Sequence, residues 1–158
     1  DYTRIYAIEM AIMGLSDEEV KRIRKDTLKS HIEAKHRPCP ELKSTILSIV
    51  EEELPKRKLS NAKIPEMVSG YFHDMAWNIK DVARVLEPGG FAAYVVGNCR
   101  FSGIHVEVDA IIGQIGESFG LEVEEILIAK TRGSSAQQVR VYGDLPLRES
   151  IVILRKPT

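Results

Sequence analysis

The stretch from Tyr71 to Asn98 constrains the fold of this chain most, because a helical pattern there runs into a turn and then into an apolar strand. Apolar residues recur at three- and four-residue steps, as on the buried face of a helix: Val68, Tyr71, Phe72, Met75, Ile79, Val82 and Leu86. Pro88-Gly89-Gly90 stops the helix and turns the chain. Residues 91–96 are apolar on both faces, which predicts a strand covered on two sides. This segment is expected to form an α/β crossover unit.

Helical patterns dominate the chain before this unit. The first segment has apolar residues at helical steps up to Gly14, and Ser16 with Glu19 forms a capping box for a helix from Asp17 to about Ala34. A third helix is expected from Glu41 to about Leu54, and a polar connector over 56–65. The apolar face of the third helix is predicted to comprise Leu42, Ile46, Ile49 and Val50.

After the crossover unit the pattern predicts a loop, a helix over 106–119 capped by Gly120, and two strands. The first strand, 121–130, loses its alternation at Glu124-Glu125, which indicates a bulge. The last strand covers 151–154. The connection over 131–150 has roughly twenty residues, where a simple hairpin needs ~2 to 5. We therefore expect a helical lobe over 1–65 and an α/β part over 66–158, with three strands and two helices.

Composition narrows the class of protein. The 158 residues are 44% hydrophobic, enough for one core, and 22 Lys and Arg against 23 Asp and Glu give a net charge of −1. No overall field therefore draws the chain to nucleic acid or membrane. Two distant cysteines, no signal peptide and no apolar run of spanning length predict a soluble cytoplasmic protein with free thiols.

The order helix, RVLEPGG, strand ending in VVGN, helix, strand, long loop and strand resembles the second half of the class I S-adenosylmethionine-dependent methyltransferase fold. It is most similar to prokaryotic DNA modification methylases, the methyltransferases of restriction-modification systems that act on exocyclic amino groups. The resemblance implies an α/β, Rossmann-like fold whose strands here would be the fifth, the sixth and an antiparallel seventh. The closing RESIVILRKP and the opening DYTRIYAIEMAIMGL also look like segments of this family.

Two motifs of that family have no counterpart in this sequence: the glycine-rich loop that holds the cofactor and the Ser/Asp/Asn-Pro-Pro-Tyr motif. Gly113 and Gly116 lie inside an amphipathic helical pattern and do not follow a strand. The resemblance implies that the catalytic motif lies upstream of Asp1. The chain is then a C-terminal piece, inactive alone, whose N-terminal half is truncated or supplied by a second chain. S-adenosylmethionine would be the cofactor of the intact enzyme, and DNA its partner; a homo-oligomer is a further possibility.

Several residues are candidates for substrate contact. By resemblance, Asp1, Tyr2 and Arg4 would follow the catalytic motif closely. Asn98 ends a strand at its carboxyl end, where α/β sheets bind ligands, although an Asn there commonly caps a turn. The long loop corresponds to a family region near the flipped base, and its polar residues suit phosphates or base edges, or simply a solvated loop: Thr131, Arg132, Gln137, Gln138 and Arg140.

Other features have mainly structural interpretations. The segment 21–37 carries a net charge of +5, seven basic residues against two acidic ones, and forms either a phosphate-binding helix or a solvated face. Arg148 and Glu149 are expected to pair with each other. Trp77 occupies a core-like helical position. The four histidines lack metal-ligand spacing, so no metal site is predicted.

Three functions remain open at this point. The first is a DNA methyltransferase acting on adenine N6 or cytosine N4. The second is an RNA-modifying methyltransferase, which would share the same strand order. The third is a non-catalytic module that binds another chain.

Overall fold

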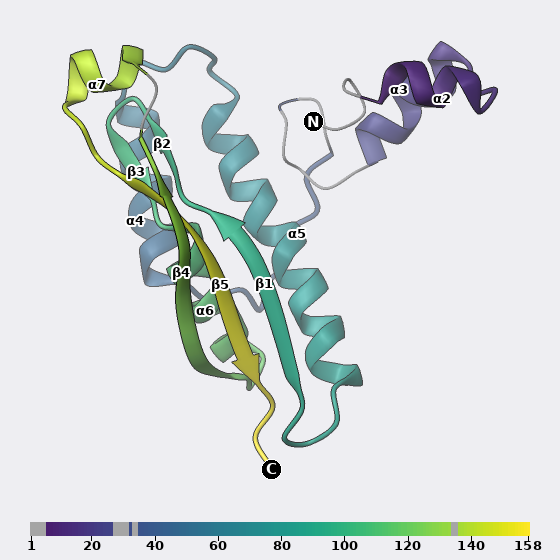
Figure 1. Ribbon diagram of the computed structural model, residues 1–158, viewed down its shortest axis with the longest axis vertical. Coiled ribbons are helices and arrows are strands. Elements are labelled where there is room, and N and C mark those ends of the chain that lie inside the picture. The colour runs from purple at the N-terminus through teal and green to yellow at the C-terminus, as the bar shows by residue number, and fades with distance from the viewer. Residues whose placement is uncertain (1–5, 27–31, 33–34, 134–135) are drawn as a thin grey trace.

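The computed structural model describes residues 6–26, 32, 35–133 and 136–158 (Figure 1). Helices and strands alternate in the C-terminal part, whereas the first part is helical. In chain order the elements are α2 (Ala7–Ile12), α3 (Asp17–Asp26), α4 (Thr45–Glu53), the 3-10 turn η1 (Leu54–Lys56), α5 (Ile64–Val85), β1 (Phe91–Gly97), β2 (Cys99–Phe101), β3 (Ile104–Val106), α6 (Val108–Ser118), β4 (Glu122–Arg132), α7 (Ala136–Tyr142) and β5 (Leu147–Arg155).

The main sheet has the order β1-β5-β4, so the last strand lies between the other two. β5 is antiparallel to both neighbours, as predicted for the closing strand. The register of β4 against β5 shifts between Val123 and Glu125, which confirms the predicted bulge, and shifts again between Ile128 and Lys130. β2 and β3 form a separate two-stranded hairpin.

One face of the sheet carries the core. Here α6 packs against all three strands, α5 packs against α6, and α4 packs against both helices (Figure 1). Fully buried side chains join the layers: Leu47, Phe72, Ile79, Ile112, Ile115, Val152 and Leu154. Gly116 lets α6 approach the sheet, because a Cβ there would lie 2.8 Å from the buried Leu154 side chain. Burial of these apolar groups is the main stabilising contribution to this half of the molecule.

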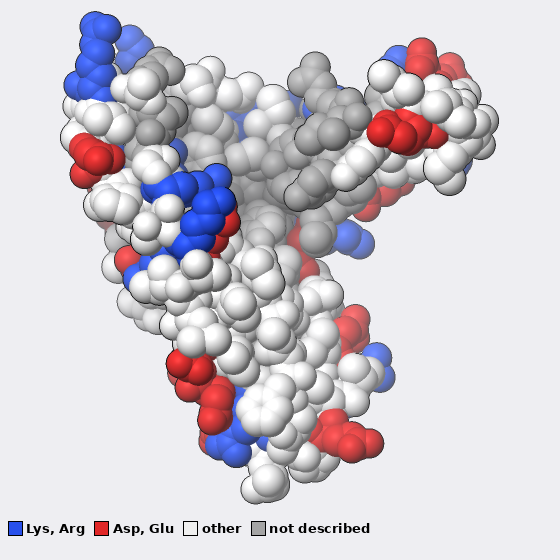
Figure 2. Space-filling view, viewed as in Figure 1, with Lys and Arg blue, Asp and Glu red and all other residues white. Residues whose placement is uncertain are grey.

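The opposite face of the sheet is bare among the described residues, which corrects the prediction that β1 is covered on two sides. Val95 is 76% exposed and Phe91 is 58% exposed, and exposed and partly buried residues alternate along β1. Figure 2 shows this face as a mainly uncharged surface below a group of Lys and Arg side chains. The apolar run in β1 therefore gives the strand a second apolar face, and no described element covers that face. We call it the open face: Phe91, Ala93 and Val95 of β1, with Ile153 opposite Ala93 and Ile151 opposite Val95 on β5.

Local signals placed several helix ends correctly. The Ser16 backbone N–H donates to the Glu19 carboxylate and Glu19 N–H to Ser16 Oγ, so the predicted capping box is formed. Gly89 and Gly120 have φ of +77° and +78°, as the predicted helix stops require. α2 and α3 project to one side of the sheet (Figure 1).

Other expectations need correction. The predicted loop after β1 is the β2–β3 hairpin, whose turn places Ser102 and Gly103 at φ of 45° and 88°. The long connection is shorter than predicted, because β4 extends to Arg132 and β5 begins at Leu147. It contains the helix α7. In α4 the buried residues include Leu47, whereas Ile49 is 57% exposed. Trp77 is half-exposed and donates to the Pro38 carbonyl, so it is not a core residue.

No helix within the described residues is long and apolar enough to cross a membrane.

Candidate functional site

Four segments meet at the carboxyl end of β1. They are Gly97 and Asn98, the β2–β3 hairpin, the end of β4 and the beginning of β5. Gly97 lies opposite Glu149 of β5, and Glu149 lies opposite Lys130 of β4, so the three residues form one row across the sheet. This end of the sheet therefore gathers residues that are distant in sequence, including several sequence-predicted candidates.

Asn98 is fully buried and caps the following helix. Its Oδ1 accepts a hydrogen bond from Asp109 N–H at 3.2 Å, and its own N–H donates to the Arg148 carbonyl at 2.9 Å. Its Nδ2 has no hydrogen-bond partner among the described residues. Asn98 therefore contacts the first turn of α6, eleven residues further along the chain, rather than the turn that follows it, and contact with a substrate stays a prediction.

A buried carboxylate joins this corner to β5. Asp109, in the first turn of α6, is fully buried and accepts hydrogen bonds from Arg148 Nε at 2.7 Å and Ser150 Oγ at 2.7 Å. Burial by itself raises the pKa of Asp109, but the hydrogen bonds from Arg148 and Ser150 outweigh it and lower that pKa below its usual value. The same pair raises the pKa of Arg148. The network fixes the position of Asn98 relative to β5.

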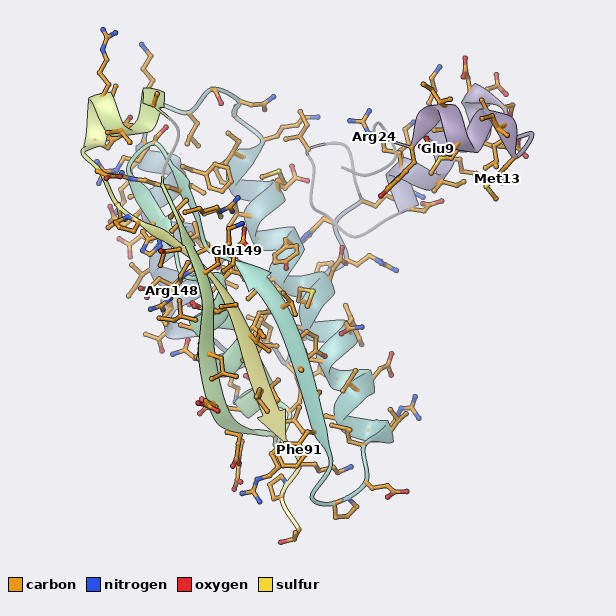
Figure 3. All side chains as sticks on the ribbon, viewed as in Figure 1. Glu9, Met13, Arg24, Phe91, Arg148 and Glu149 are labelled. Carbon is orange, nitrogen blue, oxygen red and sulfur yellow. The ribbon has the colours of Figure 1, made fainter. Side chains whose placement is uncertain are left out.

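The expected ion pair between Arg148 and Glu149 is wrong, because neighbouring residues of a strand point to opposite faces (Figure 3). Arg148 lies on the core face with Asp109. Glu149 lies on the open face, where its carboxylate is 3.7 Å from Arg132 Nε and 3.9 Å from Lys130 Nζ. Strand periodicity in the sequence predicts that the two side chains point to opposite faces, but not which residue each one pairs with.

Arg132 reaches from β4 across β5 to the end of β1. Its guanidinium would lie 3.2 Å from a Cβ at Gly97, and it donates to the Asn98 carbonyl at 3.5 Å. Because Gly97 has no side chain, the Arg132 guanidinium can lie close to the end of β1. Thr131 and Arg140 are both exposed, whereas the side chains of Gln137 and Gln138 lie outside the described residues.

The loop between β4 and β5 is attached to the β2–β3 hairpin by Arg100. Its guanidinium donates to the carbonyls of Tyr142 at 2.6 Å and Gly143 at 2.8 Å, at the end of α7, and lies over the Tyr142 ring. The ring packs on Gly103, where a Cβ would come within 2.8 Å of it. Arg100 therefore positions the loop that carries Arg140.

An apolar cavity of about 190 Å³ opens beside this corner, lined by Met67, Tyr71 and Phe72 of α5 with Gly97, Cys99 and Phe101. Burial raises the pKa of the Cys99 thiol to about 11, so it is protonated at neutral pH and is no nucleophile. The cavity has the character of a site for an apolar or aromatic group.

Some candidates lie elsewhere. Asp1, Tyr2 and Arg4 fall outside the described residues. Of the basic segment 21–37, α3 is described to Asp26, where Lys35 pairs with Asp26 at 2.9 Å. The sequence interpretation did not single out Asp109, Arg100 or Lys130. The Ser-Gly dipeptide at 102–103 was an available signal for the hairpin, but no local pattern indicates the partners of these three charged side chains.

Comparison with known proteins adds an independent observation. The type II methyltransferase M.AvaI of Nostoc sp. (strain PCC 7120 / SAG 25.82 / UTEX 2576) is 37% identical over 171 residues, which cover 99% of this chain and 36% of that protein. M.AvaI of Anabaena variabilis has the same values, and the type II methyltransferase M.BsoBI of Geobacillus stearothermophilus is 30% identical over 183 residues. This chain is related to type II methyltransferases.

The chain spans about a third of the length of these relatives, 36% in each case. No family model matches the chain, and no solved structure matches it. The predicted relationship to DNA methyltransferases is thus confirmed by sequence similarity over nearly the whole chain.

Proposed function

We propose that this chain is the C-terminal part of a site-specific DNA methyltransferase, which transfers a methyl group from S-adenosylmethionine to adenine N6 or cytosine N4. The proposal rests on the sequence similarity to type II methyltransferases, which extends over 99% of the chain. In this proposal β1, β4 and β5 are the fifth, sixth and antiparallel seventh strands of the fold, residues 1–65 are a helical lobe, and 66–158 complete the α/β domain. The strand order β1-β5-β4 supports that numbering.

The cofactor is proposed to bind in the remainder of the enzyme, where it supplies the methyl group. The two closely spaced glycines Gly113 and Gly116 lie within α6 and face Val123 and Leu154 of the sheet. They serve helix packing, so the described residues do not fit the cofactor's methionine part. No chemical step is assigned to this chain alone.

The remainder of the enzyme, on the same or on a second chain, is proposed to cover the open face and to pair with the free edge of β1. Two observations support this arrangement. The relatives are nearly three times as long as this chain. Exposed apolar strands such as β1 are also unfavourable in water. The chain would then supply one wall of the substrate pocket and part of the DNA surface.

Arg132 and Arg140 are proposed to contact DNA, since both extend from the end of β4 and the following loop. Arg132→Ala and Arg140→Ala should weaken binding of a DNA duplex while the fold is retained. Loss of a phosphate contact lowers affinity for all sequences and reduces the salt slope by about one counterion. Loss of a base contact instead costs roughly 1 to 3 kcal/mol at one target position.

Fluorescence anisotropy against salt concentration measures both effects. Arg84→Ala is the matched control, because Arg84 is exposed on α5 and pairs only loosely with Asp81 at 3.5 Å. If both loop variants keep the affinity and salt slope of the unmodified chain, the loop is a solvated connection and this part of the proposal fails.

A further inference from the structure

We infer that Lys130 and Arg132 form a binding site for a phosphate group of nucleic acid, and that Glu149 occupies this site as an internal competitor until the phosphate binds. The inference rests on the proposed function and assigns a role to a carboxylate that the function did not use. The three charged residues lie on the same side of the sheet as the open face but beyond its apolar residues, in register with Gly97 at the carboxyl end of β1.

The geometry places two cations around one carboxylate. Lys130 Nζ and Arg132 Nε lie 3.9 and 3.7 Å from the two Glu149 oxygens, and Arg132 also crosses Gly97. The absent side chain of Gly97 leaves the guanidinium room to lie over the strand end. A phosphate diester is an anion with several acceptor oxygens, which matches a guanidinium beside an ammonium group.

Glu149 is held loosely. Neither ion pair is short enough for a good hydrogen bond, and among the described residues Glu149 accepts none. At the other end of the same sheet, Glu122 accepts from Arg155 at 2.7 Å, so closely paired carboxylates do occur on this sheet. All three side chains of the Glu149 cluster are at least one-third exposed, and such pairs contribute little to stability.

The charges explain why Glu149 and a phosphate compete for Lys130 and Arg132. Lys130 and Arg132 with Glu149 carry a net charge of +1, and displacement of the carboxylate leaves two cations for the incoming anion. A ligand must therefore replace weak internal pairs, which lowers its affinity. Removal of the negative charge at position 149 should strengthen anion binding without a new contact.

Glu149→Gln tests the inference in the full chain, with a fluorescent DNA duplex as the probe. Affinity should rise, and the ratio of affinities at 50 and 200 mM salt should increase by about 3.5-fold, because one further counterion is released. Glu122→Gln is the matched control, since it removes the same charge from the far end of the sheet. Adding Arg132→Ala and Lys130→Ala to Glu149→Gln should abolish the gain.

A second arm distinguishes nucleic acid from free phosphate. Inorganic phosphate and the duplex should each shift the Arg132 Nε–H resonance in nitrogen-15 NMR spectra. If phosphate shifts it and the duplex neither shifts it nor binds, the nucleic-acid source and the proposed function are both overturned. Equal affinity gains in Glu149→Gln and Glu122→Gln would overturn the role of Glu149 and leave the DNA proposal standing. Glu149→Ala, which also removes the carboxylate, is a second variant for the affinity measurement. The melting temperature of every variant shows whether a change in affinity comes from a change in folding.

Discussion

At the residue scale, Asp109 is the side chain on which the candidate site most depends. It is fully buried, and it connects α6 to β5 through Arg148 and Ser150. A buried carboxylate is tolerated only when it is paired and hydrogen-bonded, because desolvation penalises its charged form. The network therefore stabilises one relative position of β1, α6 and β5, on which the location of Asn98 depends.

Replacing Asp109 with Asn should reduce the free energy of unfolding by about 3 kcal/mol at pH 7, the lower end of the range for broken buried pairs, since Arg148 is partly exposed. The lowered pKa of Asp109 sets the pH dependence. Its contribution is complete above the ordinary Asp pKa of about 3.9 and is lost as pH falls through the lower native value.

Urea unfolding from pH 7 to pH 2 checks this prediction. The unmodified chain should lose more stability below about pH 4 than Asp109→Asn, and their curves should converge in acid. Asp81→Asn, at an exposed carboxylate on α5, is the control and should change little. Parallel curves for the unmodified chain and Asp109→Asn would show that Asp109 is not the linked group.

At the scale of elements, the attachment of α7 to the β2–β3 hairpin sets the position of the candidate DNA loop. Arg100 donates to the last carbonyls of α7, where the helix dipole also favours a cation. The contact crosses more than forty residues of sequence, as Tyr142 and Gly143 lie 42 and 43 residues from Arg100. The loop is thus positioned by a tertiary contact and not by its own sequence.

Arg100→Ala should release α7 from the hairpin and speed amide hydrogen exchange over residues 136–146 by roughly 5- to 30-fold, equivalent to about 1 to 2 kcal/mol of local stability. The sheet should keep its protection. Tyr142→Phe retains the ring over Gly103 and serves as the control. Unchanged exchange in Arg100→Ala would mean that the loop holds its place without this contact.

At the scale of the whole molecule, the sheet has one face in the core and one face open. Val95 and Phe91 on the open face are among the most exposed large apolar side chains, beside an apolar row on β5. Monomeric proteins rarely expose contiguous apolar surface of this kind. The chain alone should therefore associate with itself as its concentration rises.

Val95→Lys should shift the chain toward the monomer in light scattering after size-exclusion chromatography. A charge in the middle of the open face would have to be desolvated in any apolar contact. Ile8→Lys is the control, because Ile8 is 74% exposed but lies on α2, away from the sheet. A strictly monomeric unmodified chain at high concentration, or an equal effect of both variants, would argue against association through the open face.

The elements whose signals are local could be predicted from the amino-acid sequence. The helix before β1, its stop at Pro88-Gly89-Gly90, the Ser16–Glu19 capping box and the bulge at Glu124-Glu125 each depend on residues a few positions apart. The antiparallel last strand and the relationship to methyltransferases were also available from the order of the motifs.

The layer on each face of the sheet and the pairing of the charged side chains depend instead on contacts between segments that are distant in sequence. The continuous apolar run of β1 gives the strand two apolar faces, but a layer on either face must come from distant segments. Arg148 and Glu149 are neighbours in sequence, yet one binds Asp109 in the core and the other faces Lys130 and Arg132 on the open face. Strand register and helix packing select those partners, and both arise from burial of apolar surface across the whole chain rather than from any local signal.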